Sequence, residues 1–374
     1  MASVIDNLED GIYSHAVDLN RFEENMKRRS IGFLCEMADD INKLLSETTI
    51  RTDDSARLNE LKRQIENIIS ESVSSAKADM RSQLIDFAPL EEKKTVDIMN
   101  DAVQVKVLTT GMTPAQLRAI VDDTLIRGAV ASDWWDRLED NTKNRIVKGI
   151  QLGFSEGESI EDMKDRLLGK RTGQFEQYVV GDKTRRRYER KGGWISMSDR
   201  EAESLIRTAV HNVSSKVRDD TYIANLDVIN AVESVATLDS RTTTLCASYD
   251  GLRWTADGHK PIGGHGKAYL PTPRHWGCRS THVPVISELD KLDQLAKQKG
   301  LKIPPAIRAS VSGPQKATQS MDSWLKKQSA SRQDRIVGGK AKGELFRKGK
   351  LKLKDFTNRR GDPLTLEELK RKGS

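Results

Sequence analysis

The chain has 374 residues, of which 36% are hydrophobic, 5% aromatic and 31% charged. A chain of that length usually folds into two or three domains, each with its own hydrophobic core. So few hydrophobic residues predict exposed helices or extended arms that gain stability from partners. This composition favours an assembly component over a compact enzyme. No window holds about eighteen consecutive apolar residues, and residues 1–20 carry acidic residues where a leader peptide is basic and then apolar. We therefore expect a soluble protein made in the cytoplasm, with no membrane partner.

The net charge of +7 is unevenly distributed along the chain. Residues 311–374 hold 17 of the 62 Lys and Arg but 7 of the 55 Asp and Glu, which gives this segment +10 and leaves −3 for residues 1–310. Such a basic segment neutralises phosphates and releases counterions, so nucleic acid is its natural partner, although an acidic protein surface would serve equally. The three cysteines are an odd, sparse set, which argues against a secreted disulfide framework.

Two amphipathic helices are predicted near the N-terminus. Apolar residues recur at helical spacing over 22–45 and again over 58–87, where we expect Pro89 to end the second helix. The apolar stripe of the second helix is close to a heptad seam. It therefore fits either a hairpin with the first helix, which we favour, or a coiled coil with another chain.

The next segment predicts three more helices, over 114–127, 133–154 and 160–168. Thr113 and Gln116 form a capping pair around Pro114, and Ser132 and Ser159 are further caps. Residues 183–193 follow, six of them basic and one acidic before a double glycine, and this pattern predicts an exposed linker. It is either a solvated charge run or a phosphate contact.

The character of the chain changes after a further helix that begins at a capping box, residues 198–201, and runs to about Asn225. Residues 228–237 and 279–286 alternate like strands, and a loop rich in Gly and Pro lies between them at 256–273. Beyond Pro304 and Pro305 the periodicity is weak, which predicts an extended basic arm.

Reactive side chains are concentrated between residues 237 and 285. Asp239 follows a strand and is expected to accept hydrogen bonds from the first amides of a short helix. Asp250 and Gly251 predict a hairpin turn. Trp254 and Trp276 are expected to be core residues rather than platforms on which bases stack.

Cys246, His275 and Cys278 have three readings. His-x-x-Cys is a spacing found in closed zinc sites, and Cys246 would supply a third ligand, with Asp239, Asp250 or His282 as the fourth. Buried thiols beside a hydrogen-bonded histidine fit equally, because no Cys-x-x-Cys pair is present. A disulfide between Cys246 and Cys278 is the third reading, disfavoured by a cytoplasmic pathway.

In order and spacing these motifs resemble the core of the Mu F-like minor head proteins of tailed bacteriophages. The resemblance covers roughly residues 198–286: the helix with Leu205 to Ala209, a strand end at Leu238, and a proline-led His-x-x-Cys-Arg knot. It implies that the following residues build a small α+β core, without implying catalysis: Asp239, Arg241, Thr242, Cys246, Asp250, Gly251, His275, Cys278 and Arg279.

The expected fold is thus mainly α with a small α+β core. We divide the chain into an N-terminal helical region (1–110), a helical segment (111–182), a basic linker (183–197), a Mu F-like core (198–303) and an extended basic tail (304–374). The resemblance implies a minor component of the virion, at the portal vertex or head interior, assembled in the host cytoplasm. Its partners would be the portal protein, the major capsid or scaffolding protein and packaged DNA, with several copies around the portal.

Two functions follow. In the first, the protein is a structural head component, not an enzyme, whose DNA contacts are Arg185, Arg186, Arg187, Lys348, Lys350, Lys352, Lys354, Arg359 and Arg360. In the second, it is a DNA-processing or injected effector enzyme in which Asp239, His275 and Arg279 supply a base, an acid and a phosphate clamp. Every residue of that second set also has a competent structural role, so the first function is our expectation.

Overall fold

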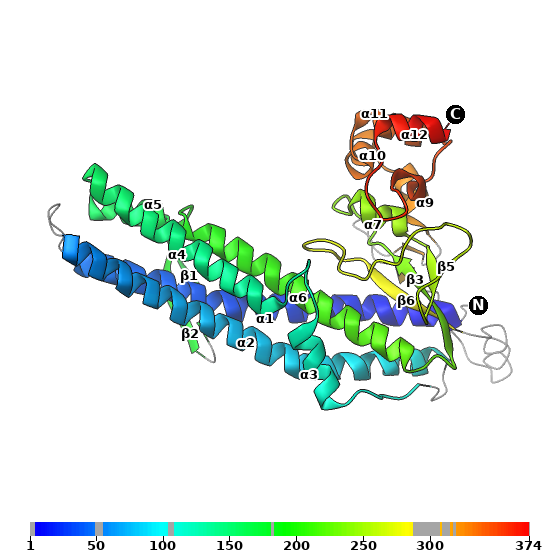
Figure 1. The fold of residues 1–374 in the computed structure, drawn as a ribbon, viewed down its shortest axis with the longest axis horizontal. Helices are drawn as coiled ribbons and strands as arrows, with labels where there is room; N and C mark the ends of the chain where they lie inside the picture. The colour runs from blue at the N-terminus through cyan, green and yellow to red at the C-terminus, as the bar shows by residue number, and fades with distance from the viewer. Residues whose placement is uncertain are drawn as a thin grey trace. The chain divides into compact units, whose positions relative to one another are not determined.

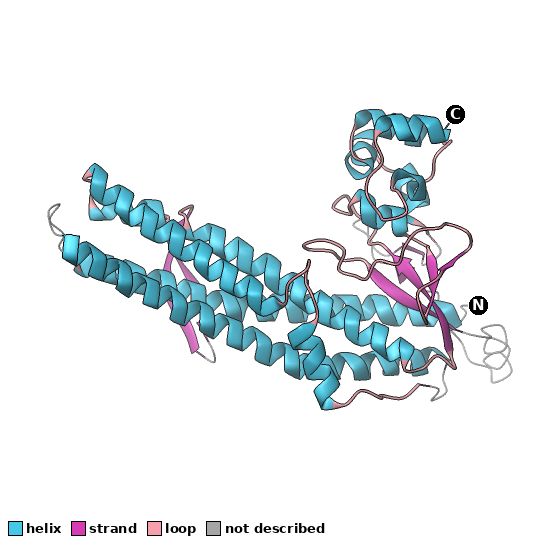
Figure 2. Cartoon of the chain, in the orientation of Figure 1, coloured by secondary structure: helices cyan, strands magenta, loops and turns pink. Residues whose placement is uncertain are grey.

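A computed structural model of the protein describes residues 4–48, 55–103, 108–180, 183–286, 307–308, 315–316 and 319–373. Long helices dominate the described residues, and the sheets are small and antiparallel (Figures 1 and 2). The predicted class, mainly α with a small α+β part, is confirmed. The chain divides into two compact units, residues 20–87 with 118–210, and residues 1–19, 88–117 and 211–374. Within the described residues, no helix has the length and apolar character needed to cross a membrane.

The first of these units is a helical bundle built around a hairpin. It contains most of α1 (Val4–Glu47), α2 (Ser55–Val103) and α3 (Pro114–Asp123), together with α4 (Ala131–Glu156), α5 (Ile160–Leu168) and the first half of α6 (Ile195–Ile223). Phe22 of α1 stacks on Phe87 of α2 with ring centroids 4.5 Å apart, and Arg29 pairs with Asp79 at 3.0 Å. These partners run in opposite directions, so α1 and α2 form the intramolecular hairpin that we favoured.

Residues 170–191 correct two predictions, the helical segment to residue 182 and the basic linker. They form an antiparallel ribbon of β1 (Lys170–Val180) and β2 (Lys183–Lys191). One face of the ribbon lies on α1, where Arg187 binds the carbonyl oxygen of Cys35 and Tyr178 binds Asp39. Gly32 permits this approach, because a Cβ built there would lie 1.7 Å from the Val179 carbonyl oxygen. The basic run is therefore structured by packing rather than solvated throughout.

Several predicted helix boundaries are also wrong. Helix α3 ends at Asp123 and not at residue 127, and α4 begins at Ala131 after Val130, so Ser132 is not its N-cap. The predicted capping box at residues 198–201 lies inside α6, which begins at Ile195, and the buried Ser198 hydroxyl instead contacts the Thr142 hydroxyl at 2.7 Å. Pro89 does not end α2, which continues to Val103. A proline removes one intrahelical hydrogen bond, and contacts made by the residues that follow it offset that loss.

Those contacts centre on Glu91, a fully buried carboxylate in the second unit. Glu91 accepts hydrogen bonds from His15 of α1 at 2.6 Å and from Ser214 of α6 at 2.8 Å, and Arg218 lies 3.7 Å away. Burial alone would raise the pKa of Glu91, but its bonds and charge interactions with His15, Arg218 and Ser214 outweigh burial and lower it. Three helices are thus joined by one charged residue.

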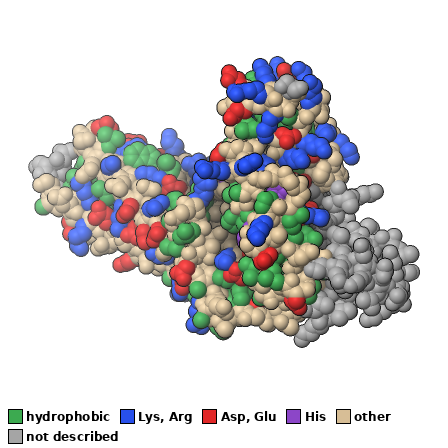
Figure 3. Space-filling model, turned by 45° about the vertical axis from the view of Figure 1, so that its right-hand side comes forward, with side chains coloured by type: hydrophobic (Ala, Val, Ile, Leu, Met, Phe, Trp, Pro, Cys, Tyr) green, Lys and Arg blue, Asp and Glu red, His purple; other side chains and the backbone are tan. Residues whose placement is uncertain are grey.

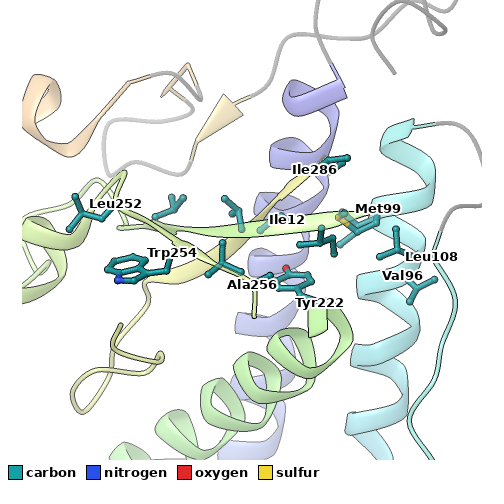
Figure 4. Close-up of a cluster of buried hydrophobic side chains, with 14 of the residues drawn as sticks. Ile12, Val96, Met99, Leu108, Tyr222, Leu252, Trp254, Ala256 and Ile286 are labelled. Atoms are coloured by element: carbon teal, nitrogen blue, oxygen red, sulfur yellow. The ribbon is translucent and has the colours of Figure 1, made fainter. Parts of the chain in front are cut away.

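The α+β part of the second unit has a four-stranded antiparallel sheet in the order β5-β4-β3-β6. Its strands are β3 (Ile229–Val235), β4 (Arg253–Thr255), β5 (Pro261–Ile262) and β6 (Thr281–Ile286), which confirms both predicted strands. Figure 4 shows Ile12, Val96 and Tyr222 from three helices beside the apolar side chains of this sheet. The strands β7 (Ile307–Arg308) and β8 (Gln315–Lys316) form a separate pair.

The predicted extended tail is wrong for residues 319–373, which fold into a helical subdomain. It comprises α9 (Met321–Lys326), α10 (Ala330–Val337), α11 (Lys340–Arg347), the 3-10 helix η1 (Leu353–Phe356) and α12 (Leu366–Gly373). Trp324, Phe346 and Phe356 are buried in a core that also includes Leu238 and Ala247. Apolar burial against a preceding segment therefore orders this basic sequence. The break predicted at Pro304 and Pro305 lies outside the described residues.

The buried carboxylate predicts a specific loss of stability. Glu91→Gln should lower the free energy of unfolding by about 3 kcal/mol, because Arg218 loses a buried counter-charge and the carboxylate that accepts from His15 and Ser214 is lost. A lowered native pKa contributes stability above the ordinary value near 4.5, and that contribution disappears as the pH falls through the native pKa. Urea unfolding between pH 7 and pH 3 should show the variant and the wild type converging at low pH. Glu71→Gln, an exposed change on the same helix, is the control; an equal loss there would contradict the assignment.

Candidate metal centre

Cys246, His275 and Cys278 come together where a short helix meets a turn. Helix α7 (Thr244–Tyr249) carries Cys246, and the hydroxyl of its N-cap residue, Thr243, accepts a hydrogen bond from the Cys246 amide. His275 and Cys278 lie on a tight turn, in which the Cys278 amide donates to the His275 carbonyl oxygen at 3.1 Å and Gly277 has a φ of 65°. The positive φ favours glycine and lets both ligand side chains of the turn face α7.

The three side chains form one compact cluster. The sulfur of Cys246 lies 3.3 Å from Nε2 of His275 and 3.6 Å from the sulfur of Cys278, and one ligand atom from each residue lies within 4.8 Å of the other two. Both cysteines are 1% exposed, whereas His275 is partly exposed. Nδ1 of His275 contacts the Trp276 carbonyl oxygen at 3.0 Å, so it carries the proton in neutral imidazole and leaves Nε2 as the electron-pair donor.

The electrostatics make Cys246 the thiolate of the cluster. A hydrogen bond from Cys278, and one from the Nε2–H of His275 when both ring nitrogens are protonated, outweigh burial and hold the pKa of Cys246 well below its usual value. The same contact with Cys246, together with burial, raises the pKa of Cys278. The hydrogen bond to Cys246 also raises the pKa of His275. By contrast, burial raises the pKa of Cys35, which lies in the other unit, to about 12.

Neither a disulfide nor a fourth protein ligand is present among the described residues. Cys246 and Cys278 are free. Asp250 accepts from the amides of Ala236 and Met321, and the two ring nitrogens of His282 contact Tyr269 at 3.0 Å and Arg274 at 3.1 Å. Asp239 is bound to Arg279. The arrangement therefore offers two sulfurs and one nitrogen to a soft metal ion, or persists as a thiolate with two hydrogen-bond donors.

Asp239 differs from its predicted role as a cap of the short helix, since Thr243 is that cap. Its carboxylate instead binds both terminal nitrogens of the Arg279 guanidinium, one at 2.9 Å, and accepts from the Arg241 amide and the Thr242 hydroxyl. Burial would raise the pKa of Asp239, but the bond and charge of Arg279 outweigh it and lower the pKa. This ion pair joins the end of β3 to the start of β6.

The predicted turn and tryptophans have mixed outcomes. Gly251 has the positive φ of a turn, 73°, but the predicted hairpin is wrong, because this turn leads from α7 into β4 and not from one strand to another. Asp250 before it connects the end of β3 to the start of α9 through its two oxygens. Trp254 is fully buried, as predicted. Trp276 is 36% exposed, so its predicted place in the core is wrong. It lies beside the His275 ligand on the surface of the turn.

The predicted phosphate contacts divide into two groups. On the ribbon, Arg185 pairs with Glu36 at 2.9 Å and Arg187 is largely buried, which leaves Arg186 on the outward face, over the Phe175 ring. In the C-terminal subdomain the predicted cations are all exposed: Lys348, Lys350, Lys352, Lys354, Arg359 and Arg360.

Sequence reasoning missed Lys267, a buried lysine in the glycine-rich loop. Its ammonium group donates to the hydroxyl and carbonyl oxygens of Thr357 and lies 5.2 Å from the Tyr249 ring centroid. Burial lowers the pKa of Lys267 to about 8. No spacing in the sequence indicates this contact, because Thr357 is 90 residues away.

Comparisons with protein-family models, with curated proteins and with solved structures gave no match.

The Asp239–Arg279 pair predicts a second stability effect. Asp239→Asn should lower the free energy of unfolding by about 2–3 kcal/mol, because a partly buried guanidinium loses its bidentate acceptor. Chemical denaturation at neutral pH measures this loss. The exposed Asp257→Asn change in the same sheet region is the control and should lie within about 0.5 kcal/mol of the wild type. Equal stability of the two variants would contradict a structural role for the Asp239–Arg279 pair.

Proposed function

We propose that this chain is a minor head protein of a tailed bacteriophage, which acts in head morphogenesis at the portal vertex or procapsid interior. The proposal rests on the resemblance of residues 198–286 to the Mu F-like core. The observation that carries it is how the polar motif residues are used: Asp239, Arg279 and Asp250 each connect segments of the chain to one another. Polar contacts of this kind stabilise the fold of a domain, which suits a structural component of an assembly.

The same contacts count against the enzyme alternative. Asp239 and Arg279 bind each other, whereas both ring nitrogens of His275 are engaged, by Cys246 and by Trp276. The cavity beside Arg279 has a volume of about 50 Å³, and its lining is mainly apolar. Ligand pockets usually measure roughly 300–1,000 Å³, so this cavity suits a few water molecules rather than a nucleotide. We therefore favour a protein that does no chemistry on DNA.

The proposed DNA contact is a basic surface on the C-terminal subdomain, hereafter the basic surface, made of Lys348, Lys350, Lys352, Lys354, Arg359 and Arg360. Leu351 and Leu353 are buried between exposed lysines, so alternation along this stretch directs the charges outward. Figure 3 shows Lys and Arg side chains on the surface of the C-terminal subdomain, at the top of the view. Exposed cations at this density attract the phosphate backbone without reading its sequence.

The other proposed partners are the portal protein and the major capsid or scaffolding protein, met by several copies of this chain. The long helices α1 and α2 offer the length for such contacts. Leu90 of α2 is 64% exposed and Leu125, just after α3, is 60% exposed, but single apolar side chains of this kind are common on protein surfaces and do not locate the contact.

DNA binding through the basic surface predicts a change in salt dependence. Replacing Lys348, Lys350, Lys352 and Lys354 by Gln should reduce the slope of log K against log salt by roughly 3–4, since each phosphate contact contributes about 0.9. Fluorescence anisotropy with duplex DNA measures this slope. The matched control replaces four exposed cations of the long helices and their neighbours, Lys43, Lys94, Arg118 and Lys148. An unchanged slope in the first variant would place the DNA contact elsewhere.

The head assignment itself predicts incorporation into particles. Co-expressed with the portal and major capsid proteins of its own phage, the chain should sediment with procapsids that contain the portal, and far less with shells that lack it. Quantitative mass spectrometry of the gradient fractions measures the copy number. Failure to enter either particle would overturn the assignment, as would DNA cleavage by the purified protein that His275→Ala abolishes.

A further inference from the structure

We propose that Cys246, His275 and Cys278 bind one Zn²⁺ ion through two sulfurs and one imidazole nitrogen, with water in the fourth position. This inference concerns a ligand of the α+β part and does not rest on the proposed head function. It begins from the mutual placement of three donor atoms, which come from a helix and from a turn about thirty residues later in the chain.

Two of the three donor separations are close to the edges of a tetrahedron around zinc, and the third, between Nε2 of His275 and the sulfur of Cys278, is at most 4.8 Å. With Zn–S distances of about 2.3 Å and Zn–N of about 2.0 Å, tetrahedral angles place two sulfurs about 3.8 Å apart and a sulfur about 3.5 Å from a nitrogen. The corresponding distances here are 3.6 Å and 3.3 Å. All three donor atoms lie within 4.8 Å of one another, as one shared ion requires.

The surroundings orient these donors before any ion binds. The Trp276 carbonyl oxygen fixes the His275 tautomer that leaves Nε2 as the electron-pair donor. The Thr243 cap stabilises the first turn of α7, which carries Cys246, and the positive φ of Gly277 fixes the backbone between His275 and Cys278. Two thiolates and an imidazole bind Zn²⁺ in preference to Mg²⁺ or Ca²⁺, which take oxygen ligands. On binding, the protons that remain on the two sulfurs and on Nε2 of His275 pass to solvent.

The position of the site gives the ion a structural consequence. Helix α7 also contacts the C-terminal subdomain: the Thr244 hydroxyl donates to the Ile336 carbonyl oxygen, the Ser248 hydroxyl contacts that of Thr357, and Ala247 lies in the subdomain core. A bond from Cys246 to zinc therefore restrains the helix on which that subdomain rests. Zinc should stabilise residues 319–373 as well as the turn.

The site is tested by metal titration of the full chain, reduced and stripped of metal under nitrogen. Co²⁺, a spectroscopic substitute for zinc, should bind at one equivalent and give thiolate charge-transfer and tetrahedral d–d absorption, both bleached by Zn²⁺. Cys246→Ser and Cys278→Ser should each weaken binding by at least about a hundredfold, more than the loss of a residue outside the ligand shell. Cys35→Ser, which removes the remaining cysteine, is the matched control and should bind like the wild type.

Hydrogen exchange of the wild-type protein covers the case in which a variant does not fold. At free zinc about a hundred times the dissociation constant, amides of α7 and of 319–373 that exchange by local opening should slow by up to about a hundredfold. Folded, reduced wild-type protein that takes up less than about a tenth of an equivalent of either metal overturns the proposal. So does a Cys35→Ser variant that loses as much binding as Cys246→Ser, or a Cys246–Cys278 disulfide in protein isolated under nitrogen.

Discussion

The two-sided packing of helix α7 is the constraint on which the α+β part and the C-terminal subdomain both depend. A helix of six residues is too short to be stable through its own hydrogen bonds. It persists because Tyr249 lies in the core of the sheet while Ala247 lies in the core of the subdomain, and because Thr243 caps its first turn. Since one short element belongs to both cores, a change on either side of it reaches the other.

Buried polar groups reinforce this arrangement by joining segments far apart in the chain. A buried carboxylate is costly unless its oxygens accept hydrogen bonds, so each one that is retained constrains its donors. Asp250 has donors at Ala236 and Met321, and Asp239 has a donor at Arg279. Lys267 does the same as a cation through Thr357.

The sequence predicted the elements whose residue pattern repeats along a continuous segment, and it missed those that depend on contacts between distant segments. The long helices and the strands around Val232 and Val283 carry apolar periodicity over many residues, and the types of Cys246, His275 and Cys278 alone indicated a cluster. The ribbon was missed because most of its residues are polar or charged and because its close approach to α1 depends on Gly32, far away in the sequence. The C-terminal helices have six to eight residues each, too few for a period to emerge. The pairing of Asp239 with Arg279 and the contacts of His282 with Tyr269 and Arg274 are tertiary contacts that no spacing encodes.

That the basic residues belong to a folded subdomain changes how a DNA contact would form. An extended arm must be ordered as it binds, and the lost conformational freedom of its backbone and side chains reduces affinity. Here Leu351 and Leu353 are already buried, so the neighbouring lysines meet a phosphate backbone with only their side chains left to order. It also follows that deleting residues 319–373 would expose Leu238 and Ala247 along with removing charge, so the loss of DNA binding in such a truncation would mix two causes. Replacing surface lysines separates charge from folding, because those side chains lie outside the core.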